Sequence, residues 1–94
     1  MILKMRLHSK NMIDKKVCIV SGGAGLLGSA FSKVCAQTGY TVIIADIDTK
    51  KGEALVKSIR KETSNDNVVF ELCDISNEAS VKNAVARVVK QYRA

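Results

Sequence analysis

The sequence predicts an α/β fold in which the strands of a parallel sheet alternate with helices. Short runs rich in apolar and β-branched residues lie at 17–20, 40–45 and 68–73, as is typical of strands covered on both faces. A segment with helical periodicity follows each run, and a glycine-rich stretch, residues 21–28, joins the first run to its helix. Strands that alternate with helices form parallel sheets with right-handed crossovers, so the expected order is β-α-β-α-β-α.

The first 13 residues are expected to form an N-terminal extension outside the fold, which then comprises residues 14–94. Charged residues interrupt this opening segment, so it lacks the uninterrupted apolar region of a secretion signal. Met12 stands just before the first predicted strand, and a true start at Met12 is the alternative to a short N-terminal arm. His8 lies in this segment and is assigned no role.

The apolar run Val17–Val20 is the predicted central strand. The helix that follows is expected to end near Gln37, because Gly39 supplies a C-terminal stop. Its apolar side chains recur at helical spacing and are expected to form the inward face: Leu27, Ala30, Phe31, Val34 and Cys35.

The second strand is expected over residues 40–45, and Asp46 follows at its end. Asp48 or Thr49 can cap a second helix that runs to about Thr63. The inward residues of this helix are expected to be Ala54, Leu55 and Ile59.

A polar turn at residues 64–67 leads to the third strand, residues 68–73, and Asp74 leaves that strand. Ser76 is the expected cap of a third helix over about residues 77–92. The apolar face of this helix is expected to comprise Val81, Ala84, Val85, Val88, Val89 and Tyr92. No strand follows to cover that face, so the sequence predicts a truncated fold: the Rossmann-type, β-α-β-α-β-α half of a doubly wound three-layer architecture.

Composition narrows the classes of partner. Of the 94 residues, 47% are apolar and 26% are charged, as in a globular domain. The net charge of +6 comes largely from the N-terminal segment and from scattered helix faces, and the few aromatic residues form no platform for stacking bases. Neither a nucleic acid nor a membrane partner is therefore expected, and a salt-dependent affinity for nucleic acid would test the weaker alternative. No run approaches the roughly 20 apolar residues of a membrane span.

Three cysteines, Cys18, Cys35 and Cys73, show no C-x-x-C spacing. Neither a metal site nor a redox motif is expected from them. We interpret all three as reduced core residues, in keeping with a cytoplasmic protein.

The glycine-rich stretch has the chemistry of a phosphate-binding turn. A diphosphate needs closely approaching amide donors, which the first turn of a helix supplies together with the positive end of its dipole. Gly22 would allow the sharp turn out of the strand, Gly25 would remove a side chain from the path of the phosphates, and Gly28 would let the helix pack closely on the sheet. A P-loop is the competing interpretation, but Ser29 and Ala30 stand where it needs a Lys and a Ser or Thr.

Two carboxylates follow strands at the same predicted edge of the sheet. Asp46 could accept hydrogen bonds from the ribose hydroxyls of a dinucleotide, and its charge would repel a 2′-phosphate, which favours NAD over NADP. Lys50 and Lys51 lie close enough in sequence to soften that repulsion. Asp74 could meet the adenine amino group, with the Ile75 backbone beside it.

With these features in order, residues 14–94 resemble the short-chain dehydrogenase/reductase family. Ser21 replaces the Thr that opens the family's glycine motif. Gly25 gives the spacing of the extended branch, which includes nucleotide-sugar epimerases and dehydratases, whereas the segment after Asp74 looks more like the ordinary branch. The resemblance implies that the phosphates, the ribose and the adenine are bound by Ser21, Gly22, Gly23, Gly25, Leu26, Leu27, Gly28, Asp46, Ile47, Asp74 and Ile75.

The family's catalytic Ser and Y-x-x-x-K pair do not occur in these residues: Ile44 stands four places after Tyr40, and Tyr92 is followed by only two residues. The expectation is therefore the cofactor-binding part of an NAD(P)-dependent oxidoreductase, inactive alone, whose complete form acts on a small-molecule carbonyl or alcohol and could be a homo-oligomer. The alternatives are a non-catalytic dinucleotide-binding module and a nucleotide-sugar epimerase or dehydratase.

Overall fold

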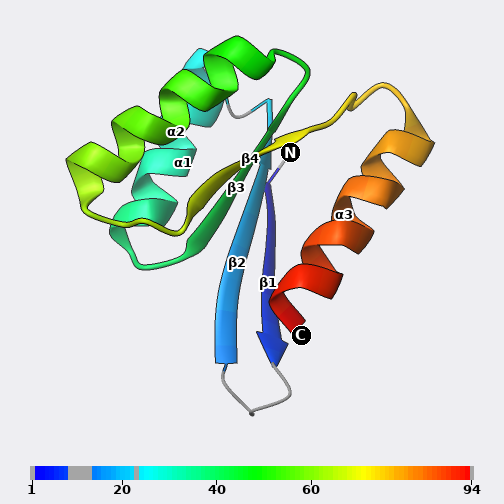
Figure 1. Cartoon of the computed structure of the whole chain (residues 1–94), viewed down its shortest axis with the longest axis horizontal. Coiled ribbons are helices and arrows are strands. Elements are labelled where there is room, and N and C mark those ends of the chain that lie inside the picture. Colours follow the sequence, from blue (N-terminus) through cyan, green and yellow to red (C-terminus); the bar gives the residue numbers. More distant parts are fainter. Residues whose placement is uncertain (1, 9–13, 23, 94) are drawn as a thin grey trace.

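The computed structural model describes residues 2–8, 14–22 and 24–93 of the chain (Figure 1). The elements follow the predicted alternation after one additional strand at the start. They are β1 (Ile2–His8), β2 (Asp14–Ser21), α1 (Leu26–Gln37), β3 (Thr41–Asp46), α2 (Thr49–Thr63), β4 (Val68–Leu72) and α3 (Glu78–Arg93).

The four strands form one sheet in the order β1-β2-β3-β4. The neighbouring strands β2, β3 and β4 are parallel, with Val20 opposite Ile44 and Ile44 opposite Phe70. This arrangement confirms the predicted α/β class and the β-α-β-α-β-α order from β2 onward. Because the three strands are parallel, their carboxyl ends meet at a single edge of the sheet.

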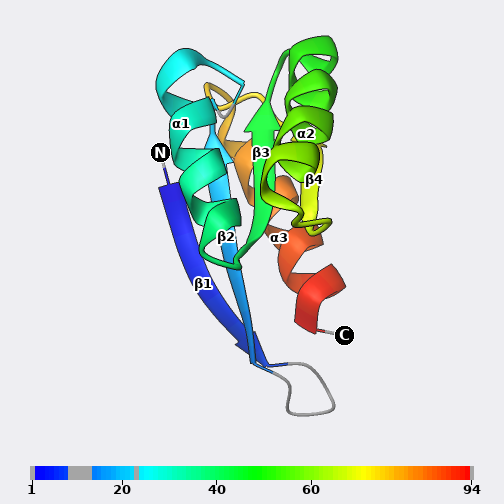
Figure 2. The same cartoon turned by 90° about the vertical axis from the view of Figure 1, so that its left-hand side faces the viewer.

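Helices cover both faces of the sheet, so the molecule has three layers. Helices α1 and α2 lie together on one face and α3 crosses the other, as the two views show (Figures 1 and 2). The core is divided accordingly. One cluster of buried side chains, which includes Val42, Ile44 and Ile59, lies between the sheet and helices α1 and α2. The other, which includes Ile43 and Val88, lies between the sheet and α3.

The expectation that residues 1–13 lie outside the fold is wrong for residues 2–8. These residues form β1, which pairs antiparallel with β2 in a register that places Met5 opposite Val17. Leu7 is buried at 3% exposure, and Leu3 and Met5 pack against the same cluster beside α3. On the opposite face, the Lys4 ammonium lies 5.6 Å from the centre of the Tyr40 ring. Residues 9–13 lie outside the described part, so the proposed start at Met12 stays a prediction.

The inward face predicted for α1 is also wrong, except at Cys35. The side chains of Leu27, Phe31 and Val34 are 69%, 42% and 56% exposed, and Ala30 is exposed as well. The residues that α1 buries against the sheet are smaller: Ser32, Cys35 and Ala36. Small side chains let a helix lie close to a sheet, so α1 packs through these three residues. Its larger apolar side chains remain exposed on the other side of the helix.

Helix α2 packs closely on β4 through a glycine. An ideal Cβ at Gly52 would lie only 2.1 Å from the Phe70 ring, so the ring occupies the space that a side chain would need. Val56 and Ile59 are buried as well, whereas the predicted inward residue Ala54 is exposed. Leu55 also packs against this core, so the predicted face holds at Leu55 and Ile59 and is wrong at Ala54.

The helix ends follow the predicted chemistry, with one change. The Lys51 amide donates to Asp48 Oδ1 at 3.0 Å, which confirms Asp48 as the cap of α2. Gly39 adopts a φ of 88° after α1, as its predicted role as a stop requires. Helix α3, however, is capped by Asn77, whose Oδ1 accepts from the Ser80 amide at 3.1 Å. The prediction of Ser76 as that cap is wrong, because its hydroxyl donates to Asp74 Oδ1 instead.

Two other kinds of site are absent from the described ranges. None of the helices there combines the length and the apolar character needed to cross a membrane. The same residues contain no group of three or more His, Cys, Asp or Glu side chains placed to hold a metal ion.

Candidate functional site

The predicted site residues gather where the parallel strands end. Register places Ser21 of β2 opposite Ala45 of β3, and Asp46 opposite Leu72 of β4. A small hollow of about 80 Å³ lies at this edge and is lined by Ser21, Gly22, Ala45, Asp46, Ile47, Cys73, Asp74 and Ile75. Predicted contacts for the phosphates, the ribose and the adenine thus meet at one place, although they come from three separate segments of sequence.

The turn after β2 is tight and depends on glycine. Gly22 adopts a φ of 66°, in the left-handed region that glycine enters readily, and its amide donates to the Ala45 carbonyl at 2.8 Å. The Gly25 amide then donates to the Gly22 carbonyl at 3.0 Å. A Cβ at Gly25 would lie 3.3 Å from that same carbonyl oxygen, so any side chain would press on the turn. Gly23, a predicted site residue, lies outside the described residues.

The turn leads directly into α1, and Gly25 is the residue that caps the helix. It provides no side-chain acceptor, and the first turn contains no acidic residue. The first amides of a helix have no partner within the helix itself and carry the positive end of its dipole. In α2 the Asp48 side chain accepts a hydrogen bond from one of these first amides, and in α3 the Asn77 side chain does so. The amide groups at Leu26, Leu27 and Gly28 therefore begin α1 without a capping side chain from the described residues.

Asp46 lies beside this turn, at the end of the next strand. Its Oδ2 accepts from the Ala24 amide at 3.1 Å, and its Oδ1 accepts from the Asp48 amide at 3.0 Å. The Asp46 carbonyl also accepts from the Cys73 amide at 3.1 Å, which extends the pairing of β3 with the segment after β4. The sequence prediction required Asp46 to lie on the same rim as the glycine turn, and the structure places it there in direct contact.

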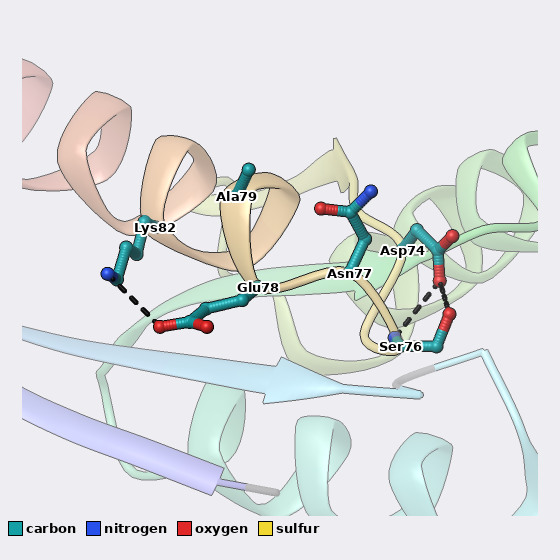
Figure 3. Close-up of a pocket in the computed structure, with 6 residues that line it drawn as sticks. All are labelled: Asp74, Ser76, Asn77, Glu78, Ala79 and Lys82. Carbon is teal, nitrogen blue, oxygen red and sulfur yellow. Dashed lines mark hydrogen bonds and ion pairs between the residues drawn. The ribbon is translucent and has the colours of Figure 1, made fainter.

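Asp74 lies on the third segment of the rim and bonds within its own turn. Its Oδ1 accepts from the Ser76 hydroxyl at 2.6 Å and from the Ser76 amide at 3.0 Å (Figure 3). These two hydrogen bonds hold the pKa of Asp74 below its ordinary value. Beyond Asp74, an open depression of about 600 Å³ extends along the start of α3, where Glu78 and Lys82 form an exposed ion pair at 3.1 Å (Figure 3).

Apolar side chains surround the polar groups of the rim. Leu26 and Leu27 on α1 are 94% and 69% exposed, and Ile47 and Ile75 are 68% and 57% exposed. A second hollow of about 410 Å³ lies on the β1 side of the turn and is lined by Ile2, Val20, Ser21, Gly22, Leu27, Gly28 and Phe31. Exposed apolar side chains of this kind offer surface to an aromatic or aliphatic ligand group.

Ala24 and Ile2 are among the residues at the site that sequence reasoning missed. Ala24 contributes only its amide, which any residue type could supply, so no sequence signal marks it. Ile2 reaches the second hollow because β1 belongs to the sheet. The signal for β1 was present in the alternation of Leu3, Met5 and Leu7 with charged residues, since period-two alternation is typical of a strand with one buried face.

The cysteines are core residues, as predicted, and all three are free and buried. The sulfur atoms of Cys18 in β2 and Cys35 in α1 lie 3.2 Å apart, on the face of the sheet that α1 covers. Burial, followed by the contact with Cys35, raises the pKa of Cys18 to about 12. Because only a thiolate reacts readily, the raised pKa makes Cys18 unreactive. Both cysteines pack in the core between β2 and α1.

Comparison with known proteins agrees with the fold. The short chain dehydrogenase family model matches residues 15–94. Secoisolariciresinol dehydrogenase of Forsythia intermedia is 38% identical over 80 residues, which make up 85% of this chain and 27% of that protein.

Solved structures show the same likeness. Menthone neomenthol reductase of Mentha piperita matches with a TM-score of 0.72 and 29% identity over 81% of this chain and 27% of that one. An NAD⁺-bound xylitol dehydrogenase matches with a TM-score of 0.73 and 28% identity over 81% of this chain and 28% of that one. The chain thus spans little more than a quarter of the length of these relatives. The match over residues 15–94 shows that the chain belongs to the short-chain dehydrogenase family.

Proposed function

We propose that this chain is the dinucleotide-binding part of an NAD(P)-dependent oxidoreductase that transfers hydride between a nicotinamide and a carbonyl or alcohol substrate. The observation that carries the proposal is the contact between the glycine turn and Asp46, from the Ala24 amide to Oδ2 at 3.1 Å. It brings an uncapped helix start and a strand-end carboxylate to one place. An anionic diphosphate and a sugar diol need that combination of donors and acceptor.

The residues present fit such a cofactor. The amides of Leu26, Leu27 and Gly28 would hold the diphosphate, since the glycine at position 25 leaves the approach to them open. Asp46 would accept from the ribose hydroxyls. Asp74 and the Ile75 backbone line the same hollow and would face the adenine.

The proposed cofactor is NAD in preference to NADP. A 2′-phosphate would have to lie against the Asp46 carboxylate, and two like charges at such a distance repel. Lys50 and Lys51 stand in the first turn of α2, a short distance along the chain. Their charges would reduce this repulsion without replacing the direct contact that Asp46 makes with the sugar.

The bound nicotinamide supplies the hydride chemistry, and the chain's own residues bind and orient the dinucleotide. The Y-x-x-x-K pair that would exchange a proton with the substrate does not occur among residues 1–94. We therefore expect these 94 residues to bind the cofactor without turning over a substrate. For the complete protein we propose a cytoplasmic enzyme of small-molecule substrates that can form homo-oligomers, with neither nucleic acid nor membrane as a partner.

Calorimetric titration of the chain with NADH tests the proposal, and two charge substitutions on α1 locate the site. Leu27 and Val34 are both exposed apolar residues of this helix, 69% and 56% exposed, at its start and near its end. Leu27→Glu adds a carboxylate where the diphosphate would bind, although the same charge favours the helix itself. Val34→Glu is the matched control.

We expect the wild type and Val34→Glu to bind NADH with similar affinity and Leu27→Glu to bind it at least about tenfold more weakly, a difference of roughly 1.4 kcal/mol. Absence of binding to the wild type at millimolar NADH would contradict the proposed function. Equal binding by the two variants would place the cofactor away from the start of α1.

A further inference from the structure

Both oxygens of the Asp46 carboxylate accept hydrogen bonds from backbone amides of the chain itself. One oxygen accepts the Ala24 amide of the glycine turn at 3.1 Å, and the other accepts the Asp48 amide at 3.0 Å. Both contacts are partly buried. A single side chain therefore joins the turn that follows β2 to the turn that follows β3.

The described part of the glycine turn also contacts the sheet through its backbone. The Gly22 amide reaches the Ala45 carbonyl at 2.8 Å, whereas the Gly25 amide bonds within the turn, to the Gly22 carbonyl at 3.0 Å. Between these two glycines, the Ala24 amide points to Asp46. This contact ties the second half of the turn, from which α1 starts, to the neighbouring strand.

We propose that Asp46 is a positioning residue that fixes the glycine turn against the end of β3 before a ligand binds. A carboxylate that accepts hydrogen bonds from backbone amides forms charge-assisted contacts, which are stronger than neutral ones. They hold the first amides of α1 at a fixed place relative to the strand ends. The turn then loses its conformational freedom during folding, so that less conformational entropy is lost when a ligand binds.

This role is compatible with a contact to the sugar. A carboxylate offers about four lone-pair directions, and the two amides occupy only two of them. The remaining directions can accept from ribose hydroxyls. One residue would then set the position of the phosphate-binding amides and bind the sugar beside them, a coupling that rests on the function proposed above.

The coupling has a consequence for cofactor preference. Replacement of Asp46 by an uncharged residue would remove the repulsion against a 2′-phosphate, but it would also release the Ala24 amide. We expect such a variant to lose affinity for NADH without a matching gain for NADPH, because both cofactors depend on the same turn.

Amide exchange measured by NMR on the cofactor-free chain tests the positioning role without any ligand. Asp46→Asn keeps the shape of the side chain but turns one acceptor into a donor, and Asp46→Ala removes both acceptors. Asp48→Asn is the matched control, because it removes the same charge two residues away and Asn still caps a helix well. Amides within β3, such as that of Ile44, report whether the sheet remains intact.

We expect the Ala24 amide to exchange about tenfold faster in Asp46→Asn and at least as fast in Asp46→Ala, the effect of losing one hydrogen bond to a charged group. Its exchange should be unchanged in Asp48→Asn, and the Ile44 amide should stay protected in all three variants. Unchanged Ala24 exchange in both Asp46 variants would overturn the proposal.

Titration with inorganic pyrophosphate, which has no sugar, separates positioning from sugar binding. If Asp46 positions the turn, Asp46→Asn binds both pyrophosphate and NADH more weakly than Asp48→Asn does. If Asp46 serves only the sugar, Asp46→Asn weakens NADH and leaves pyrophosphate unchanged or tighter, and the positioning role is excluded. Failure of the wild type to bind NADH would count against the proposed function, while the exchange result would still decide the role of Asp46.

Discussion

Two glycines allow the importance of the phosphate-binding turn to be tested with a matched pair of substitutions. Gly22 lies in the turn with a φ of 66°, and Gly39 lies after the other end of α1 with a φ of 88°. A Cβ at either position would meet nothing within 4 Å. Each change to Ala therefore adds backbone strain without a steric clash in the free protein.

The strain is similar at the two positions, and so is the expected loss of stability. A residue with a Cβ in the left-handed region is less stable by about 1–2 kcal/mol, so Gly22→Ala and Gly39→Ala should each lower the free energy of unfolding by about that amount. Denaturation by urea at 25 °C, followed by circular dichroism, measures both changes.

Binding should separate the two variants. A turn that shifts to relieve strain at Gly22 moves the amides at the start of α1, and loss of one hydrogen bond to a charged phosphate weakens binding by about 10- to 100-fold. Gly39 lies beyond the far end of the helix, so Gly39→Ala should bind NADH as the wild type does. Equal loss of NADH affinity in the two variants would refute the reasoning, because the effect would then come from general destabilisation.

Further predictions concern the sheet, the helix packing and the response to pH. Leu7→Ala should lower the free energy of unfolding by about 2–5 kcal/mol, because Leu7 is buried at 3% exposure. A change near zero in the free energy measured by urea denaturation would indicate that residues 2–8 lie outside the fold. Gly52→Ala should destabilise by about 1–3 kcal/mol, because its Cβ would lie 2.1 Å from the Phe70 ring; the gain of about 1 kcal/mol that Ala brings to an exposed helix site would contradict that packing. The Ser76 hydroxyl and amide lower the pKa of Asp74. Asp74 therefore adds stability above its unfolded-state pKa, and this stability is lost as the pH falls through its folded-state pKa. The difference in free energy of unfolding between wild type and Asp74→Asn should shrink in acid, and a difference that does not change with pH would contradict this prediction.

The parts of the fold that depend on local pattern could be predicted from sequence. The three apolar, β-branched runs lie in β2, β3 and β4, although residues 40 and 73 of the predicted ranges fall outside the strands. Asp48 caps α2 because its carboxylate lies within reach of the Lys51 amide. Gly22 and Gly39 take positive φ where sharp turns are needed. These choices depend on residues that are near neighbours in the chain.

The features that could not be predicted depend on which elements pack together. Phe31 and Val34 form part of an apolar stripe on α1, but the helix lies on the sheet through Ser32, Cys35 and Ala36. Periodicity locates such a stripe without showing what covers it. Side-chain size then decided which face of α1 could come close to the strands.

The site shows the same division. Asp46 was placed correctly at the end of its strand, because parallel strands end at one edge. Its contact with the Ala24 amide could not be read from sequence, since that amide is a backbone group far away along the chain. The alternation of Leu3 and Met5 with charged residues did indicate β1, but the charges also fitted a solvated tail.

The central claim is that the amides at the start of α1 bind a diphosphate beside Asp46. Mapping of backbone amide shifts during titration of the isotope-labelled chain with NADH tests it most directly. We predict the largest shifts at Ala24, Leu27 and Gly28, with smaller ones near Asp46. Shifts confined to the depression at the start of α3, around Glu78, or the absence of any shift at millimolar NADH, would contradict the claim.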